Sequence, residues 1–198
     1  MATETILLEH GDGGLLTSRL IAEIFLPALG NDLLARLEDS TVVDLAGARL
    51  CCTTDSYVVK PYFFPGGDIG SLAVHGTVND IAMSGGTPRF LTAGFILEEG
   101  LPLEHLKTIV ASMAAAAAQA GVQVIAGDTK VVQRGAADGI FINTAGIGVI
   151  RYPHPVSVKS IQPGDVVILN GAVGDHGAAI LSERKNLGLS SSILSDSA

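Results

Sequence analysis

The sequence predicts a mixed α/β or α+β domain that ends near Val149, followed by a connection and the start of a second unit. Apolar segments with strand-like and helix-like spacing alternate up to that point, which is typical of a sheet with flanking helices. The chain has 24 glycines, which cluster at the ends of the apolar runs, where tight turns are needed. Hydrophobic residues make up 47% of the 198 positions and charged residues 16%, so the chain can bury a sizeable core.

The first half of the chain contains two expected helices and a strand pair. In the first helix, Leu20, Ile24 and Phe25 share one face. The second helix is expected to stop at the pair Gly85-Gly86, because glycine commonly ends a helix. Helices are therefore expected at 17–28 and 69–84, strands at 41–45 and 49–54, and a loop at 62–68.

The second half continues the alternation and then changes character. Residues 151–163 contain three prolines and are expected to form a connection. The unit that follows has only one expected strand and one expected helix, which cannot bury their own apolar faces, so we expect it to be incomplete. Strands are expected at 90–97, 122–126, 139–150 and 166–169, helices at 103–120 and 175–185, and a turn at 171–174.

Charge and cysteine content narrow the class of protein. The formal net charge is −8 and the Lys and Arg residues form no run, which argues against a nucleic-acid binder. No segment has the features of a signal peptide or the length of a membrane span, so a cytoplasmic protein is expected. Cys51 and Cys52 are adjacent in an expected strand and should point to opposite faces, which argues against a disulfide between them.

Four aspartates are candidate ligands for a metal ion. Asp39 precedes a strand, Asp55 and Asp128 follow strands, and Asp80 lies on the glycine-flanked helix. Carboxylates of this kind can hold Mg²⁺ with positions left for phosphate oxygens, and Lys130 could add a charge to the phosphates. Each aspartate alone is more often a turn or cap residue. Because neither a Walker A sequence nor a GxGxxG fingerprint is present, the pattern alone indicates only an acidic domain that could hold metal and phosphate.

Six motifs occur in an order that resembles a known family. They are HGDGG (10–14), TTDSYVV (53–59), FFPGGDIG (63–70), GTVNDIAMSG (76–85), GDTKVVQRG (127–135) and GDHGAAIL (174–181). Together they resemble the HypE family of hydrogenase maturation factors, within the superfamily of aminoimidazole ribonucleotide synthetase, selenophosphate synthetase and thiamine-monophosphate kinase. The resemblance covers essentially the whole chain.

The resemblance implies a fold and a domain division. Residues 1–150 would be an ATP-binding and dimerisation domain, whose four-stranded sheet pairs with a partner's sheet to form a barrel in a homodimer. Residues 151–198 would be a linker and the beginning of an incomplete C-terminal α+β domain. ATP would lie in a cleft near the junction of the two domains.

The resemblance also implies a site for ATP and Mg²⁺. The four aspartates would bind the metal and the phosphates, and a glycine loop would close over the phosphates. Lys130 and Asp80 would take part in catalysis. The implied set comprises the metal ligands Asp39, Asp55, Asp80 and Asp128, and the nucleotide-binding residues Gly11, Gly13, Gly14, Thr53, Thr54, Asn79, Asp128 and Thr129.

The implied reaction is the ATP-dependent dehydration of a carboxamide on a C-terminal cysteine to a thiocyanate. Its cyanide would serve the iron of a [NiFe]-hydrogenase, with a carbamoyltransferase and an iron-scaffold complex as partners. This chain ends in Ser195-Asp196-Ser197-Ala198 without that cysteine, so a truncated chain that is inactive alone is expected. Another ATP-dependent enzyme of the superfamily, such as a thiamine-monophosphate kinase, and a non-catalytic dimerisation fragment are the alternatives.

Overall fold

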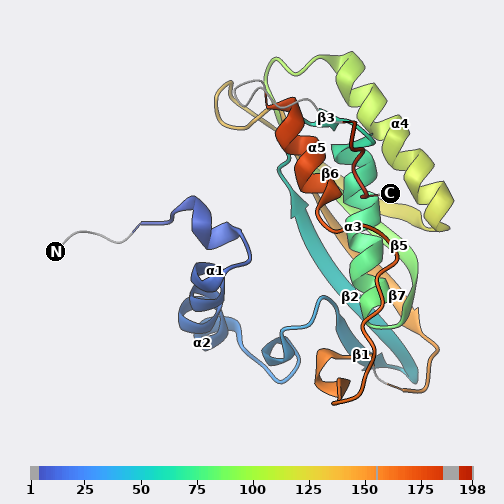
Figure 1. Ribbon diagram of the computed structural model, residues 1–198. Helices are drawn as coiled ribbons and strands as arrows, with labels where there is room; N and C mark the ends of the chain where they lie inside the picture. Colours follow the sequence, from blue (N-terminus) through green and yellow to red (C-terminus); the bar gives the residue numbers. More distant parts are fainter. Residues whose placement is uncertain (1–4, 155, 185–191, 198) are drawn as a thin grey trace.

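A five-stranded mixed sheet forms the centre of the computed structural model, which describes residues 5–154, 156–184 and 192–197 (Figure 1). The strand order is β1-β2-β7-β5-β6, and every neighbouring pair is antiparallel except β5 and β6. The sheet thus has five strands where the resemblance implied four. The strands are β1 Thr41–Leu45, β2 Ala48–Tyr57, β5 Gly86–Glu98, β6 Gln123–Val132 and β7 Ile140–Ile150, and a separate ribbon holds β3 Phe63–Phe64 and β4 Gly67–Asp68.

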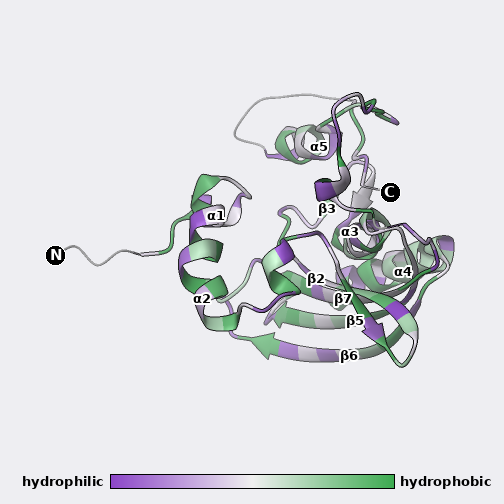
Figure 2. Cartoon of the chain, turned by 90° about the horizontal axis from the view of Figure 1, so that it is seen from below, coloured by the Kyte–Doolittle hydropathy of each residue, from purple (hydrophilic) through white to green (hydrophobic). Residues whose placement is uncertain are grey.

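Two helices, α3 (Ile69–Met83) and α4 (Leu103–Ala120), cover one face of the sheet and leave the other face open (Figure 2). The helix α3 begins where it does because Asp68 caps it, accepting hydrogen bonds from Gly70 N at 2.7 Å and Ser71 N at 3.1 Å. The helix α4 is the crossover that joins the parallel strands β5 and β6. The bounds of α3 and α4 confirm the helices predicted from the sequence at 69–84 and 103–120.

The core lies between these helices and alternate residues of the strands. On β7, Ile140, Ile142 and Thr144 are fully buried or nearly so, and the residues between them point to the open face. The alternation of burial along β7 therefore distinguishes a helix-covered face of the sheet from an open face. Cys51 is buried and Cys52 is exposed, as the alternation predicts.

The backbones of α3 and α4 approach each other closely at Gly70. A Cβ atom on Gly70 would lie 2.3 Å from the carbonyl oxygen of Ile109. Farther along α4, Ala116 and Ala117 of the alanine run are buried in the same core. Small residues on both helices thus permit the close packing that a larger side chain would prevent.

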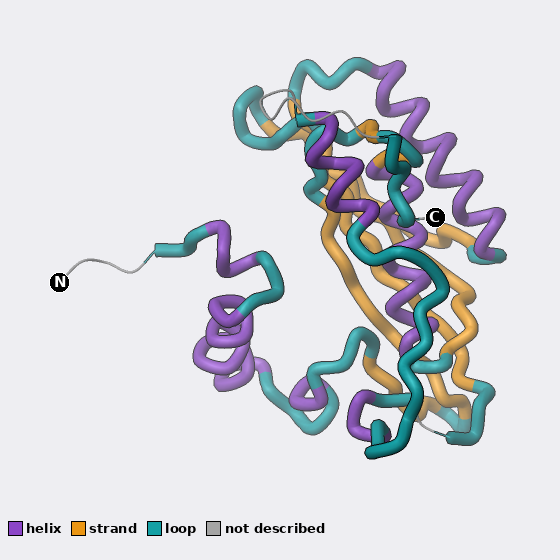
Figure 3. Tube along the Cα trace, viewed as in Figure 1, coloured by secondary structure: helices purple, strands orange, loops and turns teal. Residues whose placement is uncertain are grey.

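The N-terminal residues form a separate arm (Figures 1 and 3). Its helical segment comprises α1 (Leu15–Leu20), a π-helical stretch (Ile21–Phe25) and α2 (Leu26–Leu29), which confirms the helix expected at 17–28. Short 3₁₀ turns lie on either side, at Leu8–Gly11 and Leu34–Arg36, and none of these segments contains a buried residue.

Beyond β7, the expected strand at 166–169 is wrong. Val166, Val167 and Ile168 are 81–88% exposed and belong to no sheet, because no described strand lies beside them to accept their hydrogen bonds. A 3₁₀ turn at Val158–Ser160 and helix α5 (Asp175–Glu183) follow the connection. The predicted helix end at Lys185 lies outside the described residues. Within the described ranges, no helix is long and apolar enough to cross a bilayer.

Three strands extend farther than predicted: β5 begins four residues earlier, at Gly86, and two others continue farther at their ends. The strand β2 continues to Tyr57, so Asp55 lies inside it, and β6 continues to Val132, so Asp128 and Lys130 lie inside it as well. Both polar segments are held as strand by backbone pairing, β2 to β7 and β6 to β5, and this pairing outweighs their low strand propensity.

Candidate functional site

A cluster of carboxylates gathers where α3 crosses β2. The hydroxyl oxygen of Thr53 lies 2.8 Å from Asp80 Oδ2 and 3.0 Å from the carbonyl oxygen of Asp39. The hydroxyl has one proton, so it can donate to only one of these acceptors at a time. Asp55, two residues along β2, points to the same face as Thr53 and adds a third negative charge.

The charges in this cluster repel one another. Burial raises the pKa of Asp80 above its ordinary value, and the neighbouring charges of Asp55 and Asp39 raise it further, while the hydrogen bond from Thr53 opposes the change. Among the described residues, the ion pairs involve other carboxylates, so no lysine or arginine neutralises this cluster.

Oxygen donors without a cationic partner suit a hard divalent cation, so the donor chemistry fits Mg²⁺. Within the described ranges, no three side chains of His, Cys, Asp or Glu lie close enough together to hold a metal ion as they are arranged here. The carboxylates of Asp39, Asp55 and Asp80 would therefore have to turn toward a shared ion to hold it.

Asp80 is expected to make the metal-free protein less stable as the pH rises. Its pKa is raised on folding, so the folded chain binds its proton up to a higher pH than the unfolded chain does, and stability falls between those two pKa values. Asp80→Asn keeps an oxygen for Thr53 but carries no charge. In metal-free thermal melts from pH 3 to 8, this variant should match the wild type in acid and exceed its stability at pH 7, by less than about 1 kcal/mol because solvent screens the site. A variant that is less stable than wild type at pH 7 would contradict the charge repulsion.

Asp128 and Lys130 form a second polar group on β6. The Lys130 ammonium lies 2.8 and 3.0 Å from the two carboxylate oxygens of Asp128, and its hydrogen bond lowers the pKa of Asp128. Thr129 lies between them in the strand and points to the opposite face.

This second group faces away from the carboxylate cluster. Asp128 is in register with Gly94, Gly94 with Asn143, and Asn143 with Ser56, so the four residues share the open face. Asp55 is instead in register with Thr144, whose side chain is buried against α3. The expectation that the four aspartates meet in one site is therefore not met within one chain, because alternation along the strands separates them.

Thr54 also lies on the open face, where its hydroxyl donates to the carbonyl oxygen of Thr144 at 3.1 Å. The side-chain amide of Asn143 donates toward Thr54 Oγ1 at 3.3 Å, Ser56 Oγ at 3.0 Å and the Asp55 carbonyl at 2.9 Å. Asn79 is exposed beside Asp80 on α3. Sequence reasoning missed Asn143, whose signal is a single side-chain amide in the mostly apolar strand β7.

The glycine loop lies in the N-terminal arm. Its hydrogen bonds within the described residues remain local, from Gly14 N to Asp12 Oδ1 at 2.8 Å and from Gly13 N to Thr17 Oγ1 at 3.0 Å. A Cβ atom on Gly11 would meet nothing within 4 Å. The arm is set apart from the sheet, so the loop does not cover either polar group in this arrangement (Figure 1).

Comparison with known families identifies the domain. Residues 37–150 match the model of the AIR synthase related protein, N-terminal domain, and the match ends at Ile150, the last residue of β7. The chain belongs to this family.

Relatives of this AIR synthase related domain include carbamoyl dehydratases. The chain is 53% identical to carbamoyl dehydratase HypE of Bradyrhizobium diazoefficiens, over 96% of this chain and 55% of that protein. It is 52% identical to carbamoyl dehydratase HypE of Escherichia coli K12, over 98% of this chain and 59% of that protein. The chain thus spans little more than half of the length of these relatives.

Solved structures are similar to the AIR synthase related domain as well. A HypE–HypF complex superposes with a TM-score of 0.83 at 54% identity, over 89% of this chain and 57% of that chain. HypE in complex with ATP superposes with a TM-score of 0.73 at 52% identity, over 98% of this chain and 58% of that chain. A ThiL complexed with AMPPCP and TMP has a TM-score of 0.71 at 18% identity, over 96% of this chain and 58% of that chain, which shows a shared fold alone.

Two cavities lie close to β2; the smaller one borders Asp128 and Lys130, and neither is lined by Asp39, Asp55 or Asp80. One of about 410 Å³ lies on the open face and is lined by Ser56, Asn143, Asp128 and Lys130. A larger, open cleft of about 1060 Å³ lies between α5 and the segment that leaves β2. Its lining combines apolar side chains with charged ones, and includes Val58, Lys60, Asp138, His176, Ile180 and Arg184.

Proposed function

We propose that this chain supplies the nucleotide-binding part of a cytoplasmic carbamoyl dehydratase of the HypE type. Such an enzyme converts a cysteine S-carboxamide and ATP to a thiocyanate, ADP and phosphate, and the cyanide serves a [NiFe]-hydrogenase iron centre. The observation that carries the proposal is the carboxylate cluster of Asp39, Asp55 and Asp80, which has no cationic partner among the described side chains. The identity of about half of all residues to carbamoyl dehydratases supports the assignment of the reaction.

The residues divide the chemistry between them. Mg²⁺, when bound, would neutralise phosphate charge and orient the transferred phosphoryl group. Asp39, Asp55 and Asp80 would hold that ion, and Thr53 would orient Asp80 through its hydroxyl. Lys130 would supply a positive charge to the phosphates of ATP and would also stabilise charge that develops on the carboxamide oxygen as it accepts the phosphoryl group. Both roles depend on position more than on covalent chemistry.

Because Lys130 and the cluster face opposite sides of one sheet, we infer that a complete site needs two copies of the chain. In a barrel closed by two sheets, the open faces would line the interior and the β6 edge of one copy would adjoin the β1 edge of its partner, so Lys130 of one copy would reach the cluster of the other by turning around that edge. Large apolar side chains on the open face are partly exposed in the single chain, among them Phe90 at 40% and Ile96 at 43%. A partner sheet would bury these side chains, which supports the proposed dimer.

The cleft beside α5 would receive the nucleoside. Its apolar side chains, among them Val58 and Ile180, suit a purine ring, and Lys60 and Arg184 suit the phosphates. By the same proposal, the partners would be a carbamoyltransferase and an iron-scaffold complex. The solved HypE–HypF complex supports a maturation-factor partner.

Thermal unfolding with and without excess Mg²⁺-ATP tests the nucleotide site. A ligand at 100 times its dissociation constant stabilises the folded state by about 2.7 kcal/mol, so the melting temperature should rise, and the rise should require Mg²⁺. Asp55→Ala should abolish it. Asp44→Ala, at an exposed position of β1, is the control and should keep it. The proposal fails if the wild-type chain shows no Mg²⁺-dependent rise.

A further inference from the structure

The loop between β6 and β7, residues 133–139, is exposed but firmly attached. It contains two glycines with left-handed backbone, Gly135 at φ 84° and Gly139 at φ 85°. Exposed loops of this composition are commonly mobile, because few contacts hold them. Here one carboxylate accepts hydrogen bonds from the backbone of Gly135, within the loop, and of Gly139, at its end.

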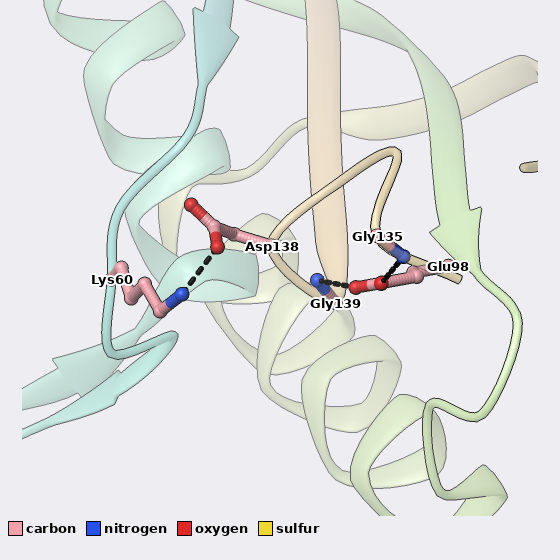
Figure 4. Close-up of polar contacts among 5 residues, drawn as sticks. All are labelled: Lys60, Glu98, Gly135, Asp138 and Gly139. Atoms are coloured by element: carbon pink, nitrogen blue, oxygen red, sulfur yellow. Dashed lines mark hydrogen bonds and ion pairs between the residues drawn. The ribbon is translucent and has the colours of Figure 1, made fainter. Parts of the chain in front are cut away.

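Glu98, the last residue of β5, is that carboxylate (Figure 4). It accepts hydrogen bonds from Gly135 N at 2.5 Å and from Gly139 N at 2.8 Å. The backbone adds a further bond, from Glu98 N to the Gly139 carbonyl at 2.8 Å. The bonds from Gly135 and Gly139 also hold the pKa of Glu98 below its ordinary value, so the carboxylate stays ionised and keeps both acceptors.

The same loop reaches the cleft through Asp138. Its carboxylate pairs with the ammonium of Lys60, which follows β2 after three residues, and both side chains line the cleft (Figure 4). Lys60 is 65% exposed and has a long flexible stem, so without this partner its ammonium would sample many positions. Glu98 is therefore linked to Lys60 by the loop and Asp138, and Glu98 itself does not line the cleft.

We propose that Glu98 is a positioning residue: by fixing the loop at residues 133–139, it keeps Asp138 and Lys60 at the rim of the cleft in the arrangement that receives a nucleotide phosphate. The inference rests on the proposed function, because it takes the cleft as the nucleotide site. It adds residues that the sequence motifs did not mark as functional, Glu98, Asp138 and Lys60.

Glu98→Gln tests the proposal, since the amide keeps the shape of the side chain but replaces one acceptor by a donor that opposes a backbone N–H. Two quantities are measured on the full chain well below its melting temperature. Amide hydrogen exchange at Gly135 and Gly139 should accelerate by at least about tenfold, and the dissociation constant for Mg²⁺-ATP should rise by about five- to tenfold. Glu99→Gln, at the adjacent exposed position, should change neither quantity.

A second control separates positioning from general loss of stability. Ile109→Val shortens a fully buried side chain of α4, outside the loop and the cleft lining, and should lower the melting temperature without changing the dissociation constant. If Glu98→Gln accelerates exchange but binds Mg²⁺-ATP as the wild type does, the positioning role is wrong and the proposed function stands. Unchanged exchange at both glycines also overturns it. A wild-type chain that binds no Mg²⁺-ATP overturns the proposed function and this inference together.

Discussion

Mixing Asp55→Ala chains with Lys130→Ala chains should restore the Mg²⁺-ATP binding that each variant loses alone. In a two-fold dimer whose sites combine the carboxylate cluster of one copy with β6 of the other, each mixed dimer has one intact site and one doubly altered site. With random exchange, half of the dimers are mixed, so about a quarter of all sites should bind. Titration calorimetry after co-refolding of equal amounts measures that stoichiometry.

A second mixture serves as the control for this experiment. Asp55→Ala combined with Asp80→Ala alters the cluster of both chains, so no dimer in this mixture contains an intact cluster. This mixture should bind no nucleotide. If the first mixture also fails to bind while the wild type binds, the site lies within one chain, and Lys130 must reach the cluster by a rearrangement of the sheet.

Gly70→Ala should destabilise the domain by about 3 kcal/mol, among the largest effects expected of a single methyl group. The added Cβ would lie 2.3 Å from the carbonyl oxygen of Ile109, and a backbone atom in a packed helix cannot move aside as a flexible side chain can. The two helices would have to separate, which opens gaps in the core. Urea unfolding monitored by circular dichroism gives the free energy of unfolding.

Gly177→Ala is the matched substitution on another helix. A Cβ atom there meets nothing within 4 Å, and alanine favours helix over glycine by about 0.5–1 kcal/mol. The two variants should therefore differ in sign. Equal unfolding midpoints for Gly70→Ala and the wild type would show that α3 and α4 are not packed as closely as the geometry indicates.

Helices and buried strands were the predictable part of this fold. The residues of α3, α4 and β7 are marked by apolar spacing and glycine exits, and each lies within a few residues of its expected limits. The ends of β2 and β6 were not predictable, because polar residues such as Asp55 and Asp128 lie inside them and are held there by pairing with a neighbouring strand. Conversely, the apolar run at 166–169 predicted a strand, but no described strand is available to pair with it.

For the candidate site, the sequence motifs identified residues but could not predict on which face of the sheet each side chain lies. The proximity of Asp80 to Thr53 depends on where α3 crosses β2, which periodicity does not fix. The separation of Asp128 from Asp55 depends on strand register, because a shift of one residue would turn either side chain to the other face. The Glu98 contact uses the backbone N–H groups of two loop glycines. Every residue except proline has such a group, so the sequence does not indicate which of them bind Glu98.

The position of β6 at the rim of the sheet has a consequence for handling the protein. It pairs with β5 on one side, and along its other side the described residues leave a row of backbone N–H and C=O groups next to exposed apolar side chains such as Val131, Val124 and Ile125. A strand of this kind is a template on which further chains can add and aggregate. If a partner normally covers this rim, then at one fixed concentration a chain that has lost the partner should precipitate more readily on warming than the intact assembly.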